Sequence, residues 1–205
     1  AELITVGDEL LIGQVVDTNS PWMASQLNAI GVEVTRRVAV ADSKAEINKA
    51  LAEALTRVQV VLITGGLGPT NDDLTRDALA EFYACGQTLN SDVLGAIEER
   101  FKTRGIPMPV INKRMAMVPD KARVIPNQWG TAPGLLFETD HTLVWALPGV
   151  PSEMKGIMAG SVLPLLKEKA AGNVILHRTI QTFGLAESTL AERISDWESA
   201  LPEYM

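Results

Sequence analysis

The sequence predicts an α/β fold with three α/β/α layers around a mostly parallel central sheet, followed by the start of a small α+β segment. Apolar runs of strand length alternate with segments of helical period from the N-terminus onward, which is the pattern of βαβ units. One of these runs is almost uninterrupted, as in a parallel strand covered on both faces. With 205 residues, of which 46% are hydrophobic, the chain is large enough to bury a core between such layers.

The first strand and helix are marked by clear boundaries. Glu2–Val6 is a short apolar run. Ser20 and Pro21 are typical of an N-cap and a first helical position, and Gly31 is typical of a helix end. Val32–Val40 is rich in β-branched residues, which predicts the second strand.

The second helix and third strand complete a β-α-β-α-β order. Ser43 and Glu46 have the spacing of a capping box, in which each side chain satisfies a free N–H of the first helical turn. The residues that follow show the spacing of a buried helical stripe: Ile47, Ala50, Leu51, Ala54, Leu55 and Val58. Gln59–Thr64 is the nearly uninterrupted apolar run, and we expect it at the centre of the sheet.

The rest of the chain predicts helices first and a pair of strands later. Helices are expected over about Asp72–Cys85 and over Asp92–Arg104, the latter capped by Ser91. Ile106–Asn127 contains four prolines and is left unassigned. Two strands and a long helix follow, at Leu135–Phe137, Thr142–Leu147 and Pro151–Lys169.

A domain boundary is predicted near Ala170–Asn173. Residues 1–170 then form the α/β domain, and residues 171–205 begin a separate segment with a strand at Val174–Phe183 and a helix at Ser188–Trp197.

Charge and composition exclude several classes of partner. The net charge is −7 and no run of Lys or Arg exceeds two residues, so nucleic acid is not an expected partner. No apolar run approaches the ~20 residues of a membrane-spanning helix. The single Cys85 excludes an internal disulfide, and no signal peptide is visible, so we expect a cytoplasmic location.

Glycines and carboxylates follow the predicted strands. They occur at Gly7-Asp8-Glu9, at Asp42, at Gly65–Asp73 and at Pro148–Pro151. In open α/β sheets, ligands bind outside the carboxyl ends of the strands. The sequence therefore predicts a ligand site where these four loops meet.

The Gly65–Asp73 loop is the most informative of the four. Gly65, Gly66 and Gly68 lack the Cβ atoms that would keep an anion from the backbone, and Thr70 can cap the helix that follows. A helix start offers free N–H groups, so we expect an anion site, although neither standard phosphate-binding motif is present.

A divalent cation is expected beside this loop. Asp72 and Asp73 are neighbours that repel each other unless something positive lies between them. Mg²⁺ or a similar ion binds one or two carboxylates together with substrate phosphates, and Asp8 could join them. The alternative is a simple Gly-rich turn followed by ordinary acidic residues at a helix start.

Four ordered motifs resemble the N-terminal domain of CinA-type competence/damage-inducible proteins. They are Thr64-Gly-Gly-Leu-Gly-Pro-Thr-Asn-Asp-Asp-Leu-Thr75, Val6–Gly13 with Asp17–Asn19, Gly130-Thr-Ala-Pro-Gly134, and Leu147–Met154. Together they span about residues 3–160. The wider group is the molybdopterin-binding-like domain of MoaB, MogA and gephyrin, where Gly-Gly-Thr-Gly precedes an Arg-Asp pair. Leu67 and Asn71-Asp72-Asp73 differ from that pattern and favour the CinA-type branch.

The resemblance implies a molybdopterin-binding-like fold and a metal-dependent pyrophosphohydrolase that acts on ADP-ribose or a similar nucleotide substrate. It also implies that residues 171–205 begin a KH-like segment, since Arg178–Gly184 with Glu187 resembles its opening. CinA-type proteins often continue into a nicotinamide mononucleotide deamidase domain, and we assign no activity of that domain to these residues.

Roles for individual residues follow as a hypothesis. Asp73, with Asp8 and Asp72, would hold the metal, while Glu9 or Glu153 would be the general base for an attacking water. The predicted substrate- and phosphate-binding residues are Gly65, Gly66, Gly68, Thr70, Asn71, Asn19, Gly130, Thr131, Pro148, Gly149 and Ser152. For Asp17-Thr18-Asn19, simple helix-entry turn chemistry is an equally good explanation.

Two other functions stay open at this stage. One is a molybdopterin-binding or molybdenum-cofactor-synthesis protein, because the scaffold resembles that group. The other is a non-catalytic scaffold that dimerises and positions downstream domains. A homo-oligomer is expected only by analogy with the family.

Overall fold

The computed structural model describes residues 1–169 and 179–201. The chain divides into two compact units, Ala1–Ile175 and Leu176–Met205, which are described separately. The predicted boundary at Ala170–Asn173 and the first part of the predicted strand Val174–Phe183 lie outside the described residues.

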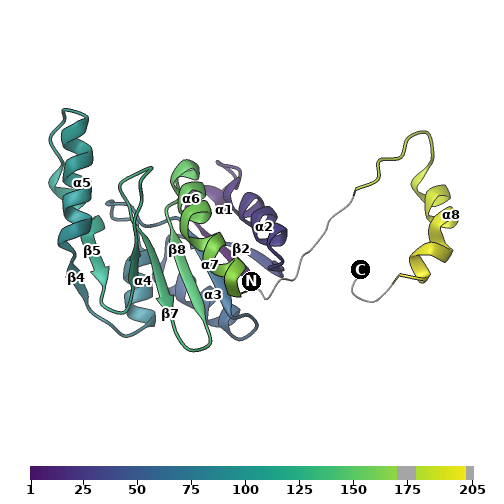
Figure 1. The fold of residues 1–205 in the computed structure, drawn as a ribbon, viewed down its shortest axis with the longest axis horizontal. Helices are drawn as coiled ribbons and strands as arrows, with labels where there is room; N and C mark the ends of the chain where they lie inside the picture. Colours follow the sequence, from purple (N-terminus) through teal and green to yellow (C-terminus); the bar gives the residue numbers. More distant parts are fainter. Residues whose placement is uncertain (170–178, 202–205) are drawn as a thin grey trace. The chain divides into compact units, whose positions relative to one another are not determined.

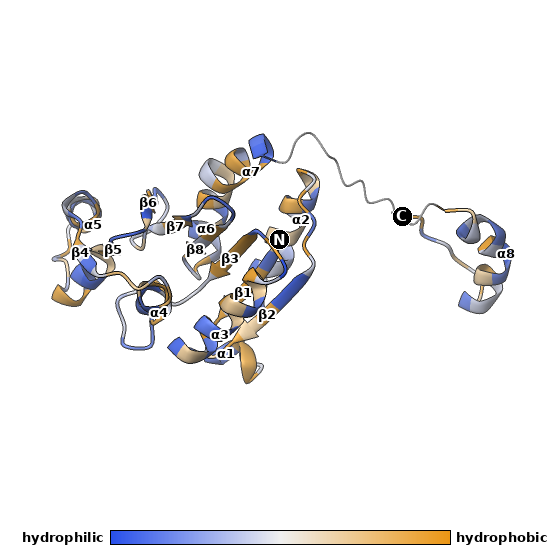
Figure 2. Cartoon of the chain, turned by 90° about the horizontal axis from the view of Figure 1, so that it is seen from below, coloured by the Kyte–Doolittle hydropathy of each residue, from blue (hydrophilic) through white to orange (hydrophobic). Residues whose placement is uncertain are grey.

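The first unit is built on a six-stranded sheet (Figure 1), and its strand order β2-β1-β3-β8-β7-β6 can be followed by the labels in Figure 2. The four parallel strands are β1 (Glu2–Val6), β2 (Arg36–Val40), β3 (Val60–Thr64) and β8 (Leu143–Leu147). β7 (Gly134–Glu138) runs antiparallel to β8, and β6 (Arg123–Ile125) pairs antiparallel with β7 at the edge of the sheet. The prediction of a mostly parallel central sheet is therefore confirmed.

Helices cover both faces of this sheet. One hydrophobic cluster joins Ile4 and Ile63 to α3 (Lys44–Leu55), α4 (Thr75–Phe82) and α5 (Ser91–Thr103). The other joins Leu3 and Leu62 to α2 (Asn19–Ala29) and α6 (Pro151–Ile157). Successive strand residues thus enter opposite layers, as the period-2 geometry of a strand requires. Figure 2 shows β3 coloured as hydrophobic, which matches its burial on both faces.

Some predicted helices differ from the structure at their ends. Pro151–Lys169 is helical throughout, but it consists of α6, a π-helical turn η2 (Met158–Val162) and α7 (Leu163–Lys169). α4 begins at Thr75, three residues after the predicted start, because Asp72 and Asp73 belong to the preceding loop. The longest helices of the described residues have 13 residues each, and none there is long and apolar enough to cross a membrane.

The predicted caps are only partly correct. Ser43 is the N-cap of α3, but its side chain makes no capping hydrogen bond. At α5 the cap is Asn90, whose side chain accepts from two backbone N–H groups, and not Ser91. At α2 the Asp17 carboxylate accepts from the N–H groups of Asn19 and Ser20, each at 3.0 Å.

Several short elements have no counterpart in the prediction. A four-residue helix, α1 (Asp8–Leu11), follows β1 directly. The Pro-rich segment contains the 3₁₀ helix η1 (Val110–Ala116) and the strand β5 (Met117–Pro119), which pairs with β4 (Gln87–Leu89) in a separate two-stranded sheet. β2 begins at Arg36, later than the predicted Val32.

The second unit contains α8 (Glu187–Ser199), close to the predicted helix Ser188–Trp197. Residues 179–183, the described part of the predicted strand Val174–Phe183, form no strand. This part of the strand prediction is wrong.

An ion pair between Glu2 and Arg57 lies at the N-terminal end of β1. The carboxylate of Glu2 is 3% exposed and accepts from Arg57 Nε at 2.7 Å and from Nη2 at 2.8 Å. The hydrogen bonds from Arg57, more than the opposing burial, hold the pKa of Glu2 below its usual value. The buried negative charge of Glu2 is thereby balanced by a bidentate guanidinium group.

We expect Glu2→Gln to lower the free energy of unfolding by about 1–3 kcal/mol at neutral pH, since it removes a charge-assisted pair. Because the pKa of the folded state is lowered, this stabilisation is fully present above the unfolded-state value of about 4.3 and is lost as pH falls through the folded value. Urea unfolding of both proteins from pH 3 to 7 measures the difference. If the difference in the free energy of unfolding between the two proteins did not become smaller toward acid pH, the stabilisation would not come from the charged Glu2–Arg57 pair.

Candidate functional site

Three loops meet at the carboxyl ends of β1, β3 and β8 and surround one cleft of about 400 Å³. They are the turns after Val6, after Thr64 and after Leu147. Parallel pairing of the three strands places these turns in one row. We call this hollow the Gly-rich cleft.

Ten predicted site residues line the Gly-rich cleft. They are Glu9, Gly65, Gly66, Gly68, Asp72, Asp73, Thr131, Pro148, Gly149 and Glu153. Asp42, Met115, Ala132 and Val150 line it as well and were not predicted as site residues. Asp42 had a signal in the sequence, since it follows the second strand. Met115 had none, because it lies in the unassigned Pro-rich segment.

Six predicted site residues lie outside this lining. Asn19 borders a neighbouring cavity of about 150 Å³ and donates to the carbonyl of Gly149 at 2.8 Å. Gly130 lies next to Thr131 but lines a second cleft. The remaining four are Asp8, Thr70, Asn71 and Ser152.

The glycines at the start of the loop are required by its backbone. Gly65 has φ of +106°, and a Cβ there would lie 2.3 Å from the carbonyl oxygen of Val6. Gly66 has φ of +67°, and its Cβ would lie 2.3 Å from the hydroxyl of Thr75. That hydroxyl donates to the Gly65 carbonyl at 2.7 Å. These glycines thus bring the loop against β1 and α4, in addition to opening the cleft.

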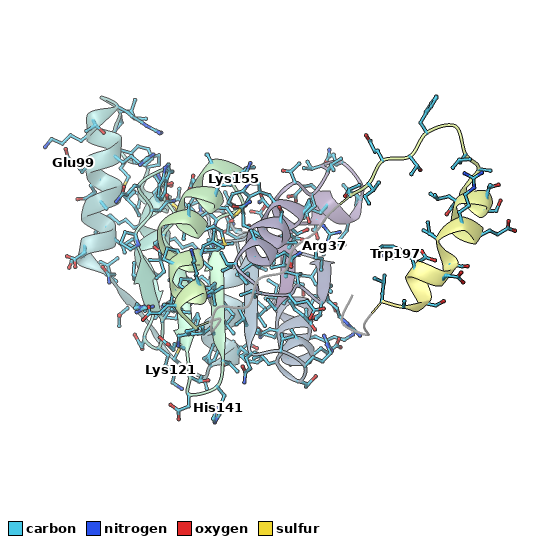
Figure 3. All side chains as sticks on the ribbon, turned by 45° about the vertical axis from the view of Figure 1, so that its right-hand side comes forward. Arg37, Glu99, Lys121, His141, Lys155 and Trp197 are labelled. Atoms are coloured by element: carbon cyan, nitrogen blue, oxygen red, sulfur yellow. The ribbon has the colours of Figure 1, made fainter. Side chains whose placement is uncertain are left out.

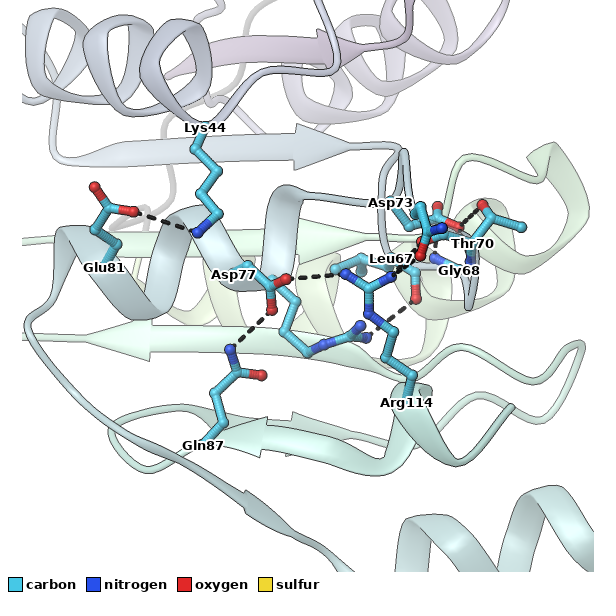
Figure 4. A network of polar contacts seen from close by, with 11 residues as sticks. Lys44, Leu67, Gly68, Thr70, Asp73, Asp77, Glu81, Gln87 and Arg114 are labelled. Atoms are coloured by element: carbon cyan, nitrogen blue, oxygen red, sulfur yellow. Dashed lines mark hydrogen bonds and ion pairs between the residues drawn. The ribbon is translucent and has the colours of Figure 1, made fainter. Parts of the chain in front are cut away.

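The carboxylate of Asp73 faces back into its own loop (Figure 4). It accepts from the N–H groups of Gly68 and Thr70, each at 2.8 Å, and from the Thr70 hydroxyl. The Asp73 carboxylate thereby binds N–H groups that we expected to bind a phosphate. The role of Gly68 and Thr70 toward a bound anion stays a prediction.

Arginines lie behind the same loop. Arg114 donates to the carbonyl of Thr70 at 2.7 Å and to Asp77 at 3.1 Å (Figure 4). Arg76 is 2% exposed, and its Nε and Nη2 have no hydrogen-bond partner among the described residues. Burial lowers the pKa of Arg76, and the Asp77 carboxylate opposes that effect. Sequence reasoning missed both arginines.

Acidic groups gather on the other side of the cleft. The N–H groups of Asp8 and Asp42 each donate to the other residue's carboxylate, at 2.9 and 3.2 Å. Burial raises the pKa of Asp42, and the negative charges of Asp8, Glu9 and Asp72 raise it further. The described residues nevertheless contain no group of three or more acidic, His or Cys side chains placed to hold a metal ion. Asp8, Asp72 and Asp73 therefore form no metal centre by themselves.

Glu153 lies at the border of the cleft and is half-buried. Burial raises its pKa, while the hydrogen bond from Asn127 and the charges of Arg100 and Arg104 oppose the rise. The carboxylate rests on Gly130, where a Cβ would lie 1.7 Å from its Cδ atom. This position beside the cleft suits a proton acceptor or a hydrogen-bond acceptor.

His141 and Lys155, both labelled in Figure 3, do not line the Gly-rich cleft. His141 lies in the turn before β8, at the opposite end of the sheet from the cleft. Lys155 on α6 lies over the Trp22 ring, 5.4 Å from its centroid.

The chain matches a family profile described as "Probable molybdopterin binding domain" over residues 2–168. A CinA-like protein of Cytophaga hutchinsonii is 44% identical over 205 residues, which are all of this chain and 49% of that protein. The chain thus spans about half the length of the curated relatives it matches first.

Solved structures agree with this match. A CinA protein of unknown function from Thermoplasma acidophilum superposes with a TM-score of 0.71 at 34% identity, over 82% of this chain and 96% of that one. The molybdopterin biosynthesis enzyme MoaB of Thermus thermophilus superposes with a TM-score of 0.53 at 21% identity, over 85% of this chain and 98% of that one. The second likeness supports the three-layer fold.

The prediction of a metal-dependent ADP-ribose pyrophosphohydrolase is wrong on these findings. The matching family is described by molybdopterin binding, and none of these proteins is described as an ADP-ribose hydrolase. They support the molybdopterin-binding alternative better. The chain therefore belongs to the molybdopterin-binding domain family and is a CinA-like member of it.

Proposed function

We propose that this chain binds a molybdopterin-type ligand, a pterin that carries a phosphate ester, in the Gly-rich cleft. Family membership supports the pterin, and a hollow of about 400 Å³ at the strand ends is large enough for a two-ring heterocycle. The observation that carries the proposal is the set of carboxylates that line the cleft beside its Gly-rich loop, namely those of Glu9, Asp42, Asp72 and Glu153.

The hydrogen-bond donors of a pterin ring suit the carboxylates that line the cleft. Its aminopyrimidine edge presents neighbouring N–H donors, and an ionised carboxylate accepts two such bonds side by side. Asp42 and Glu153 are partly buried, which makes a hydrogen bond there stronger than in water. Asp73 is not assigned this role, because its carboxylate already accepts from Gly68 and Thr70.

A divalent cation is a second part of the proposal. Asp8, Glu9 and Asp72 raise the pKa of Asp42 by their charge, after the larger effect of burial, so the cluster has excess negative charge. An ion of the Mg²⁺ type prefers oxygen ligands and usually keeps several waters. Since the described residues assemble no complete metal centre, the bound ring and water would supply the remaining oxygen atoms.

The other expectations remain predictions for this chain. They are a cytoplasmic location, a homo-oligomer, and no binding to nucleic acid. The related proteins include a biosynthesis enzyme, MoaB. For this chain, which spans about half of its first curated relatives, we propose binding and assign no turnover.

We expect Asp42→Asn to weaken binding of 6-hydroxymethylpterin about tenfold or more, since a hydrogen bond to a charged group contributes about 1.5–3 kcal/mol. Titration followed by pterin fluorescence measures the dissociation constant. Asp140→Asn, the same change in the exposed β7–β8 turn, is the matched control and should bind as the wild type does. Equal affinity of all three proteins would remove Asp42 from the site.

Binding should also weaken on acidification. Burial raises the pKa of Asp42 and of Glu153, so both become protonated at a higher pH than ordinary carboxyl groups. A protonated carboxyl group no longer accepts two N–H bonds. The dissociation constant, measured from pH 7.5 downward, should therefore begin to rise above the usual carboxyl range near pH 4. A constant affinity down to pH 4 would contradict this role.

Removing divalent ions tests the cation separately. We expect 6-hydroxymethylpterin to bind several-fold more tightly with Mg²⁺ than with EDTA, because the ion offsets the acidic cluster. Asp72→Asn should reduce this gain, whereas Asp140→Asn, in the exposed β7–β8 turn and outside the Gly-rich cleft, should leave it intact. Calorimetry with and without Mg²⁺ measures both. The same affinity under both conditions would rule out the cation and leave the pterin proposal standing.

A further inference from the structure

A second cleft, also of about 400 Å³, lies between α5 and the segment Val124–Pro133. Its walls include the apolar side chains of Val93, Ile97 and Pro133. Arg100 lines it from α5, and we call it the Arg100 cleft. No role proposed above uses it.

The Arg100 cleft adjoins the Gly-rich cleft. Thr131 lines both of them. Gly130 lines the Arg100 cleft and touches Glu153, which lines the other. The side chain of Asn127 fixes the turn between the clefts, since it accepts from the N–H groups of Trp129 and Gly130 and donates to the carbonyl of Ala132. The two clefts therefore meet at Thr131 and its neighbour Gly130.

The two clefts differ in charge. Among the described residues, five carboxylates and no Lys or Arg line the Gly-rich cleft, whereas one arginine and one acid, Asp92, line the Arg100 cleft. Asp92 lies eight residues before Arg100 on the same helix, so the two backbone positions are about 12 Å apart. The arginine end of the cleft is the end that borders Gln128 and the shared turn.

The guanidinium of Arg100 has unused donors. It gives one hydrogen bond within the described residues, from Nη1 to the carbonyl of Gln128 at 3.1 Å, and its Nε is buried without a partner there. Arg104 follows one helical turn later, and the positive charges of Arg100 and Arg104 both act on Glu153. A guanidinium binds phosphate with paired N–H bonds, so this end of the cleft suits a phosphate group.

We propose that the Arg100 cleft is the phosphate subsite: the ring of the ligand lies in the Gly-rich cleft, and its phosphate monoester extends past Thr131 to Arg100. The assignment of ring and phosphate rests on the function proposed above. The opposite placement would put a phosphate among five carboxylates and against a loop whose Gly68 and Thr70 N–H groups already bind Asp73.

Two probes separate the two subsites. We compare 6-hydroxymethylpterin with its phosphate monoester on the wild type, Arg100→Gln, Arg100→Lys and Lys102→Gln. Lys102 has an 80% exposed side chain on the same helix and lies outside both clefts, so its variant controls for the change in net charge. Thermal unfolding of each variant reports whether it is folded.

We expect the wild type to bind the phosphate ester about tenfold more tightly than the unphosphorylated pterin, given the strength of hydrogen bonds between charged groups. Arg100→Gln should abolish this preference, which compares the two pterins on the same protein and is therefore independent of any effect of the lost charge on Glu153. Lys102→Gln should keep the preference, and Arg100→Lys should retain part of it. A preference that survives Arg100→Gln, or that Lys102→Gln abolishes equally, would overturn the proposal.

Failure of the pterin proposal would be visible on its own. If neither pterin binds the wild type, inorganic phosphate becomes the probe, and the NMR signal of the Arg100 Nε–H group is followed during its addition. A saturable shift that Lys102→Gln retains supports an anion subsite at Arg100 without the pterin. An unchanged signal overturns the subsite as well.

Discussion

Parallel pairing of β3 with β1 and β8 is the constraint on which the site depends. Thr64 lies opposite Thr5 on one side and Leu147 on the other, so the chain leaves all three strands at the same level. The N–H of Gly65 still bonds the carbonyl of Leu147 at 3.1 Å, which holds the first turn of the loop to the sheet. Loops that are distant in the sequence thereby become the walls of one cleft.

The loop after β3 is stabilised from within. Asp73 binds two backbone N–H groups of its own loop, and Arg114 binds the loop carbonyl of Thr70 while it pairs with Asp77. Buried Arg76 lies behind the same turn, and two of its nitrogens have no hydrogen-bond partner in the described part of the chain, an arrangement that is costly in a protein interior. Of the three acids predicted as metal ligands, Asp73 thus stabilises its own loop, Asp72 lines the cleft, and Asp8 lies outside the lining and bonds Asp42.

Charge distribution links the cleft to its surroundings. The Gly-rich cleft concentrates carboxylates, and the positive charges of Arg100 on α5 and of Arg104 directly after it act on Glu153 at the border of the cleft. A ligand with donor groups at one end and an anion at the other matches this polarity along its length. This arrangement agrees with a binding domain for a phosphorylated pterin better than with an anion site at the Gly-rich loop alone, because the loop N–H groups have internal partners.

Local patterns determined the order of strands and helices, the central place of Val60–Thr64 and the strand ends where glycines and acids gather. These features are readable because burial imposes a period of 2 or 3.6 on the sequence itself. Tertiary structure alone decided that Asp73 turns inward and that the Pro-rich segment supplies Met115 to the wall of the cleft. These contacts depend on which atoms meet between loops that are distant in the sequence. The periodicity of hydrophobic residues within a single segment does not predict them.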